Sequence, residues 1–310
     1  MDKLDGRILA QLTADSRKPY SGIAKSLRTS KEVVNYRIRR MEREGIIRGY
    51  DTVIDHTCLG YQSYRLLLKL SSLDENLIHR MVAHLKKLKT VNFLVHIADE
   101  YDIAVIFNEP DQATFIRKYR KLIDAFSASI IRKEVNIIEN IRQFQIPFAA
   151  KRELFSFSWT KKQYLKETDK NILKRIAKDA RRTYVNIGEE LGLRANTVMY
   201  RVRNMEKAGI IKGFTIDIDW QKIGYMHHKV FLYLTDASKR DQLKSYLSTI
   251  PEMIYITEVA GDQDLEFEML CRDQMMLLDR LNTIKKEFPI KRSVSLVTLK
   301  VIEINYLPLH

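Results

Sequence analysis

The sequence predicts an α+β protein in which two winged helix-turn-helix domains alternate with two ferredoxin-like βαββαβ domains. Three observations support this prediction: a repeat with a period of 164 residues, basic residues gathered into two segments, and hydrophobic spacing that changes from helical to strand-like within each repeat. The predicted parts are the first helix-turn-helix (1–50), the first βαββαβ domain (51–147), a linker (148–165), the second helix-turn-helix (166–214) and the second βαββαβ domain (215–310).

The repeat aligns residues 5–61 with residues 169–225 without a gap. Of the 57 paired positions, 22 are identical, whereas chance pairing at ordinary composition gives roughly one match in fifteen. The period is too long for a solenoid, whose units are about 20–50 residues long. We therefore interpret the chain as a duplication of one whole functional unit.

The net charge of +14 is unevenly distributed along the 310 residues. Residues 1–50 and 166–214 each carry +6, residues 148–165 carry +3, and the two βαββαβ segments carry +1 (51–147) and −2 (215–310). Basic residues that served only solubility would be spread along the chain and not gathered in particular segments. The segregation favours a polyanion as the partner of the two helix-turn-helix segments.

Several classes of protein are disfavoured by the composition. There is no run of about 18 apolar residues that could cross a membrane, and the first residues do not resemble a secretory signal. Cys58 and Cys271 are not at equivalent places in the two repeats and are expected to be reduced thiols. His227 and His228 are the only adjacent histidines, so no metal site is predicted. We expect a cytoplasmic protein without membrane contact, metal or other cofactor.

The first fifty residues have the spacing of three helices. Apolar residues from Leu4 to Leu12 recur at helical intervals, and the polar segment 15–19 ends that helix. A short second helix is predicted from Ser21 to Leu27. The third begins after Ser30, a favoured N-cap, and runs to about Glu44, just before a glycine. Two short helices, a tight turn and a longer basic helix are typical of a helix-turn-helix.

The third helix of each repeat presents a polar face opposite its core face. In the first repeat the core face carries Val34, Ile38 and Met41. Basic side chains can bind phosphate and guanine, asparagine can bind adenine, and apolar atoms can contact the thymine methyl. An ordinary arginine-rich surface helix is the alternative, but the pattern occurs twice. The residues predicted to bind DNA are Lys31, Glu32, Asn35, Tyr36, Arg39, Arg40 and Arg43, and in the second repeat Asn196, Met199, Tyr200, Arg203, Asn204 and Lys207.

After each third helix, the run Gly-Ile-Ile-basic-Gly-aromatic leads into β-rich residues, which predicts a wing or hinge strand. The order β-α-β-β-α-β follows in both repeats, and a sheet with helices on one side leaves an open face. Pairing of the two copies would cover that face. The predicted elements are 64–70, 75–88, 91–98, 103–108, 111–125 and 130–141, and then 229–234, 239–249, 253–260, 265–271, 274–288 and 293–304.

This arrangement resembles the Lrp/AsnC (feast/famine) family of transcription regulators. The resemblance implies that the βαββαβ domains are RAM domains, which pair through their sheets and can bind amino acids. The family unit is usually about half this length, so a covalent tandem is unusual. The residues that carry the resemblance are Leu4, Asp5, Ile8, Leu9, Asp15, Ser16, Arg17 and the run 45–50, with Asp169, Ile172, Leu173, Asp179, Arg181 and the run 209–214 in the second repeat.

The family tends to show Gly-x-x-Asp near its effector pocket. Gly261, Asp262 and Asp264 fit this pattern and are the predicted effector-binding residues. In the first repeat Asp99 stands at the glycine position, so that site is expected to be altered or lost. An equally good interpretation is that both loops are acidic turns without a ligand. The repeats also differ at Arg28, which corresponds to Gly192.

We interpret the chain as a sequence-specific DNA-binding transcription regulator, modulated by a small molecule such as an amino acid, with double-stranded DNA as partner and no catalytic residue. An alternative is a sirohaem-decarboxylase-like tetrapyrrole enzyme, but such enzymes favour His and Arg around the middle-strand loop, which is acidic here although His96 lies near it. A third is a binding hub or an RNA-binding module. Pairing of the two repeats predicts an intramolecular pseudo-dimer with two dissimilar half-sites, or a homodimer with four reading heads.

The linker is expected to be docked on the protein rather than flexible. Flexible linkers favour Gly and Ser, and the segment from Phe148 to Lys166 has no glycine. It contains instead the aromatic residues Phe155, Phe157, Trp159 and Tyr164.

Overall fold

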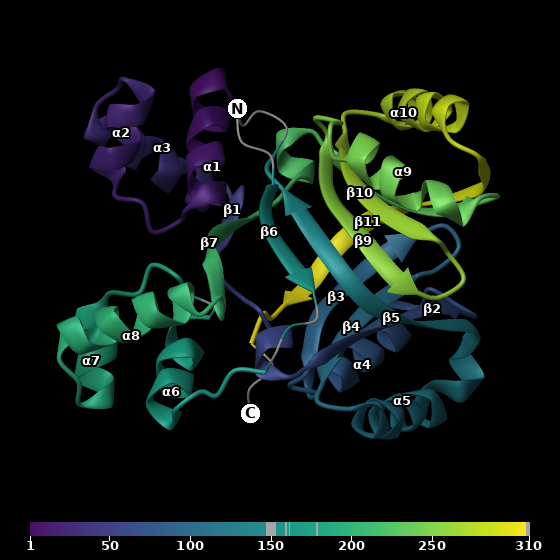
Figure 1. Cartoon of the computed structure of the whole chain (residues 1–310), viewed down its shortest axis with the longest axis horizontal. Helices are drawn as coiled ribbons and strands as arrows, with labels where there is room; N and C mark the ends of the chain where they lie inside the picture. Colours follow the sequence, from purple (N-terminus) through teal and green to yellow (C-terminus); the bar gives the residue numbers. More distant parts are fainter. Residues whose placement is uncertain (147–152, 159, 161, 178, 308–310) are drawn as a thin grey trace.

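The computed structural model describes residues 1–146, 153–158, 160, 162–177 and 179–307. Two small helical heads lie on one side of the molecule, and a β-barrel with four outer helices lies on the other (Figure 1). A two-stranded ribbon lies between the heads and the barrel. Within the described ranges, no helix is both long and apolar enough to cross a membrane.

Each head contains the three helices that the sequence predicts. The structure also confirms the predicted cap of the third helix in the first head, because the Ser30 hydroxyl accepts a hydrogen bond from the Val33 amide at 3.2 Å. The corresponding residue Arg194 makes no capping side-chain bond to the described residues. The helices are α1 (Lys3–Ala14), α2 (Tyr20–Leu27) and α3 (Lys31–Arg43) in the first head and α6 (Glu167–Ile176), α7 (Tyr184–Leu191) and α8 (Ala195–Lys207) in the second.

The tight turn between the second and third helices has the same backbone in both heads. Gly192 has φ of 66° and Arg28 has φ of 54°, so both lie in the left-handed region. Arginine at this position therefore does not alter the turn, although the conformation is unfavourable for a residue with a Cβ.

The predicted hinge strands β1 (Ile47–Ile54) and β7 (Ile211–Ile218) pair with each other in an antiparallel ribbon. Each strand also completes the head of the other repeat. Ile216 and Ile218 are buried in the core of the first head, whereas Ile54 is buried in the core of the second. The ribbon is thus shared by both heads and fixes them to one another.

The two βαββαβ units have the predicted element order. The last strand of each unit is longer than predicted, and single-turn 3₁₀ helices lie at Thr57–Leu59, Ser127–Ser129, Gln221–Ile223 and Ala237–Lys239. The first unit consists of β2 (Gln62–Leu70), α4 (Glu75–Lys86), β3 (Val91–Ala98), β4 (Ile103–Glu109), α5 (Gln112–Phe126) and β5 (Ile130–Phe144). The second consists of β8 (Met226–Leu234), α9 (Arg240–Leu247), β9 (Met253–Ala260), β10 (Leu265–Cys271), α10 (Gln274–Glu287) and β11 (Ile290–Ile304).

The two four-stranded sheets join at both edges. Their orders are β5-β2-β4-β3 and β11-β8-β10-β9, and the antiparallel pairs β3–β11 and β5–β9 close the eight strands into a barrel. Closure removes the exposed edges of both sheets. Helices α4 and α5 cover one side of the barrel, and α9 and α10 cover the opposite side (Figure 1). The faces without helices point inward and form a shared apolar cluster that includes Leu67, Phe231 and Leu296.

The linker contains a strand that the sequence analysis did not predict. β6 (Glu153–Ser158) pairs antiparallel with β5, and its Phe155 and Phe157 side chains are buried beside Val53 of the ribbon. The expectation of a docked linker is therefore confirmed for this segment. It is wrong for Tyr164, whose side chain is 90% exposed. Trp159 lies outside the described residues.

Candidate nucleic-acid interface

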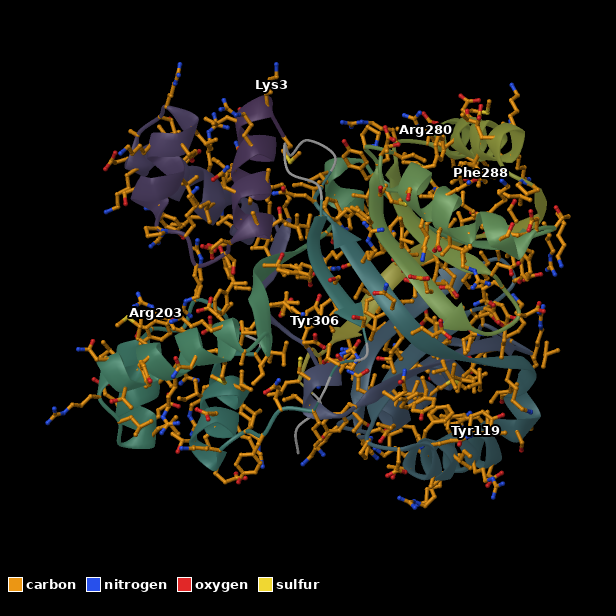
Figure 2. The ribbon with its side chains drawn as sticks, viewed as in Figure 1. Lys3, Tyr119, Arg203, Arg280, Phe288 and Tyr306 are labelled. Atoms are coloured by element: carbon orange, nitrogen blue, oxygen red, sulfur yellow. The ribbon has the colours of Figure 1, made fainter. Side chains whose placement is uncertain are left out.

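Helices α3 and α8, which the sequence predicts to read DNA and which we call the reading helices, bury one face and expose the other. Val34, Ile38 and Met41 are fully buried, whereas Tyr36 and its equivalent Tyr200 are 63% and 65% exposed. Arg203 projects from α8 (Figure 2). Of the predicted DNA-binding residues, Lys31, Glu32, Tyr36, Arg39, Arg43, Asn196, Tyr200, Arg203, Asn204 and Lys207 are exposed, and Asn35, Arg40 and Met199 are half-buried.

Arg40 has an intramolecular partner. Its guanidinium binds the Asp5 carboxylate at 2.6 Å, and Asp5 is 1% exposed. This pairing restricts the side chain, so Arg40 is less available to DNA than the other predicted residues. Arg39 remains exposed, and its Nε donates to Asn35 Oδ1 at 3.2 Å on the same helix face.

A repeated ion pair joins the first and third helices of each head. Arg37 lies 2.8 Å from Asp5, and the equivalent Arg201 lies 2.9 Å from Asp169. Identity of both partners in the two repeats was visible in the sequence, but their pairing was not. These arginines position the reading helix and are not part of its exposed face.

A reciprocal exchange between the repeats holds the two heads together. Arg17 donates to the backbone oxygens of Ala180 and Arg182, the latter at 3.3 Å. Arg181 donates to the Ser16 backbone oxygen at 2.7 Å and to the Tyr20 hydroxyl at 2.5 Å. The two helices that could read DNA are thus held in a defined relative position.

The predicted effector residues lie in the loop between β9 and β10. Asp264 accepts a backbone hydrogen bond from Leu234 at 2.7 Å, just as Asp102 in the first repeat accepts one from Leu70 at 2.8 Å. This aspartate therefore has a structural role in both loops. The space beside Gly261 is occupied by the Asn136 amide from the other unit. Asp262 is exposed. The Arg240 guanidinium lies 3.5 Å from the Asp264 carboxylate, so this carboxylate is paired within the chain.

At the glycine position of the first loop, Asp99 has φ of 105°. This is an unfavourable conformation for a residue with a side chain. The two loops therefore differ in backbone as well as in sequence.

The barrel interior holds a group of charged residues that the sequence analysis did not predict. Arg65 and Glu266 form a buried, two-pronged ion pair, and Lys229 lies 3.2 Å from Glu266 and 2.6 Å from Glu268. His227 lies 2.7 Å from Glu268. Burial alone would raise the pKa of Glu266, but Arg65 and Lys229 outweigh this effect and lower it below its ordinary value. Charged residues within otherwise apolar strands were the available sequence signal.

Comparison with known proteins places these features in a family. The sequence model described as winged helix-turn-helix DNA-binding matches residues 1–48 and 165–212, which correspond to the two heads. The HTH-type transcriptional regulator Rv2324 of Mycobacterium tuberculosis is 33% identical over 136 residues, which cover 44% of this chain and 92% of the relative. The HTH-type transcriptional regulator LrpC of Bacillus subtilis is 30% identical over 97 residues, covering 31% and 67%. The chain belongs to the Lrp/AsnC family.

Relatives of half this length match one repeat, so the chain is a tandem duplication of the Lrp/AsnC unit. The whole chain also shares its fold with the crystal structure of the siroheme decarboxylase NirDL, with a TM-score of 0.66 and 13% identity over 98% of this chain and 94% of that one. At this identity the likeness concerns the fold alone. The two-unit architecture of this tandem is thus shared with a siroheme decarboxylase, and fold alone does not determine activity.

Proposed function

We propose that this Lrp/AsnC protein is a sequence-specific DNA-binding transcription regulator whose helices α3 and α8 read one duplex together. One observation supports this most strongly: two exposed basic helices, one in each repeat, are fixed relative to one another by a shared ribbon and the Arg17 and Arg181 contacts. A second helix in the major groove requires such a fixed spacing. The net charge of +6 on each head favours the DNA backbone as partner.

The two reading helices differ in the residues that would contact bases. Glu32 and Asn35 on α3 correspond to Asn196 and Met199 on α8. Asparagine favours adenine, glutamate accepts from cytosine, and an apolar side chain contacts thymine. A symmetric dimer presents identical helices to two identical half-sites. This pseudo-dimer within one chain presents different helices, so its preferred site has two dissimilar half-sites.

The first test removes Arg39 and Arg203 together. Both are exposed, so the double alanine variant should fold normally and bind DNA at least about tenfold more weakly. Its salt dependence should be shallower, by about one unit of logarithmic slope for each phosphate that the variant no longer binds. A matched control is Arg120→Ala, an exposed arginine on α5 of the barrel, which should leave affinity unchanged. Equal affinity of the double variant and the control would exclude this reading face.

The second test selects binding sites from random duplexes with the intact chain. Enrichment of two different half-sites at fixed spacing is expected. Recovery of a symmetric palindrome would mean that identical heads from two chains cooperate, and the asymmetric pseudo-dimer would then be wrong.

Tetrapyrrole decarboxylation is a second candidate because of the NirDL fold, and a NirDL crystal structure contains an iron-uroporphyrin III analogue. The cavity between the barrel and the hinge ribbon has a volume of about 200 Å³. For comparison, a cavity of about 150 Å³ holds a single benzene. A macrocycle does not fit. The Glu266 and Glu268 carboxylates already pair with Arg65 and Lys229, so these cations are not free to bind a polycarboxylate. We expect no change in the absorption spectrum of iron-uroporphyrin on mixing with this protein.

A further inference from the structure

We propose that the cavity between the barrel and the hinge ribbon is a binding site for a small uncharged molecule. The molecule would have one ring-sized apolar body and an end that both donates and accepts hydrogen bonds. The cavity has a volume of about 200 Å³ and is separate from the loop at 261–264, none of whose residues lines it. Only its regulatory consequence rests on the proposed function, because binding itself is measured without DNA.

One wall of the cavity is polar. Arg65, His227, Lys229 and Glu268 line it, and all four are largely buried. Arg65 is 2% exposed, and its Nε meets no acceptor among the described residues. A buried donor without an acceptor is unfavourable. The Nε atom is itself covered by protein atoms, so a ligand would meet the other lining groups, of which Lys229 supplies donors and Glu268 an acceptor.

The charges of this wall already balance. Arg65 and Lys229 face the carboxylates of Glu266 and Glu268, and both carboxyls have pKa values below the ordinary range, so both are ionised. Burying one further charge without a counterion is costly. The site therefore favours a ligand whose polar end has no net charge, such as an amide.

Beside this polar group the lining of the cavity is apolar, because the duplication has diverged here. By strand register, Ala104 and Ile106 of β4 are the equivalents of Glu266 and Glu268 of β10: Ala104 pairs with Leu67 and Glu266 pairs with the equivalent Phe231. Both first-repeat residues line the cavity. A barrel made from two identical subunits would have the same residues on both walls. This chain has carboxylates on β10 but apolar residues at the equivalent positions of β4, so its lining is asymmetric, which suits an amphipathic ligand in a single orientation.

The ribbon strands contribute to the mouth of the cavity. Arg48 of β1 and Asp217 of β7 form an ion pair at 2.6 Å, and both line the cavity. Tyr306, another lining residue, lies between the heads and the barrel (Figure 2). A bound molecule would contact the element that carries both heads, so its binding would alter their mobility.

The test uses three probes of nearly the same shape: benzamide, benzoate and benzylamine. Ligand-observed NMR on the full chain should show saturable binding of benzamide, with the two charged probes about tenfold weaker or more. Hydrogen exchange should slow in β1 and β7 when benzamide is bound. No saturable binding of benzamide, or equal binding of all three, would overturn the proposal.

Variants locate the site. Ala104→Phe fills the cavity and should abolish benzamide binding, whereas Ala113→Phe, at an exposed position on α5, should not. If Ala104→Phe does not fold, Glu268→Gln provides a second test. It removes one negative charge, so the preference should change from benzamide to benzoate. Retained binding by a folded Ala104→Phe, or an unchanged preference in Glu268→Gln, contradicts the assignment. Failure here would leave the DNA assignment intact, because that assignment is tested by DNA titration alone.

Discussion

Arg17 and Arg181 occupy equivalent positions in the two repeats, and each binds the other repeat. The guanidinium of Arg17 lies 4.3 Å from the centre of the Tyr184 ring, and that of Arg181 lies 4.6 Å from the centre of the Tyr20 ring. Both also donate to backbone oxygens across the interface. The pair therefore links the orientation of one reading helix to that of the other.

Removing this pair should destabilise the contact between the heads. Hydrogen bonds from a charged donor contribute about 1.5–3 kcal/mol and a cation–π contact about 0.5–1 kcal/mol. We expect Arg17→Ala and Arg181→Ala each to lower the free energy of unfolding by about 1–3 kcal/mol in a denaturant titration. Lys25→Ala, an exposed change on α2, is the control. The double variant should also tolerate an added base pair between half-sites, and unchanged spacing preference would argue against the linkage.

The two reading helices begin differently, which predicts opposite effects of substitution. Ser30→Ala removes the cap of α3 and should cost about 1 kcal/mol. Arg194→Ser would supply a cap to α8 and should stabilise its head by a similar or smaller amount. Thermal unfolding monitored by circular dichroism compares the two. Stabilisation by both changes, or by neither, would contradict this account.

The left-handed turn between the second and third helices of each head allows a second pair of matched substitutions. Arg28→Gly should remove backbone strain in the first head and stabilise it. The gain should not exceed about 1 kcal/mol, because glycine also increases the entropy of the unfolded chain, which opposes folding. Gly192→Arg should introduce that strain and destabilise the second head by about 1–2 kcal/mol. Chemical denaturation of both variants measures the difference. A destabilising Arg28→Gly would show that the side chain has contacts that outweigh the strain.

Arg65 and Glu266 are expected to make a coupled contribution to the free energy of unfolding. Arg65→Met alone leaves a buried carboxylate with reduced compensation and should cost about 3–5 kcal/mol. The double variant Arg65→Met with Glu266→Met should be much closer to the original stability, because apolar residues of similar volume can replace a buried pair. A double-mutant cycle in denaturant gives the coupling. Additive losses would mean that the pair is not coupled.

His56 should make stability depend on pH. Burial penalises the imidazolium and lowers the pKa of His56 from 6.5 to about 4, and the Asp55 carboxylate opposes only part of this effect. Between these values the unfolded chain takes up a proton at His56 and the folded chain does not. The free energy of unfolding therefore falls as the pH falls through this window, by on the order of 3 kcal/mol. His56→Gln should flatten this part of the profile, and an unchanged slope would count against the assignment.

The helices and hinge strands could be predicted because their signals are local. Ser30 marks a helix start, and Val34, Ile38 and Met41 recur at helical spacing, which is sufficient to define both faces of α3. The exposed positions of Tyr36 and Arg39 follow from the same periodicity.

Closure of the barrel could not be predicted in the same way, because it depends on the registers of β3 with β11 and of β5 with β9. Those registers join segments far apart in the chain. Arg65 and Glu266 are 201 residues apart in the chain, so their pairing could not be predicted from the sequence either. β6 is a different case: Phe155, Ser156, Phe157 and Ser158 alternate as in a strand, but the segment lies between the repeats, where a linker is predicted.

The barrel that closes within one polypeptide also affects how DNA occupancy responds to the amount of protein in a cell. A regulator built from separate subunits dissociates on dilution, so its occupancy of DNA rises more steeply than its concentration. In the proposed pseudo-dimer both reading helices are delivered together by each molecule, at an effective concentration set by the ribbon and not by expression. Occupancy is then expected to follow a simple hyperbola, and a few molecules per cell would act with the same affinity as many.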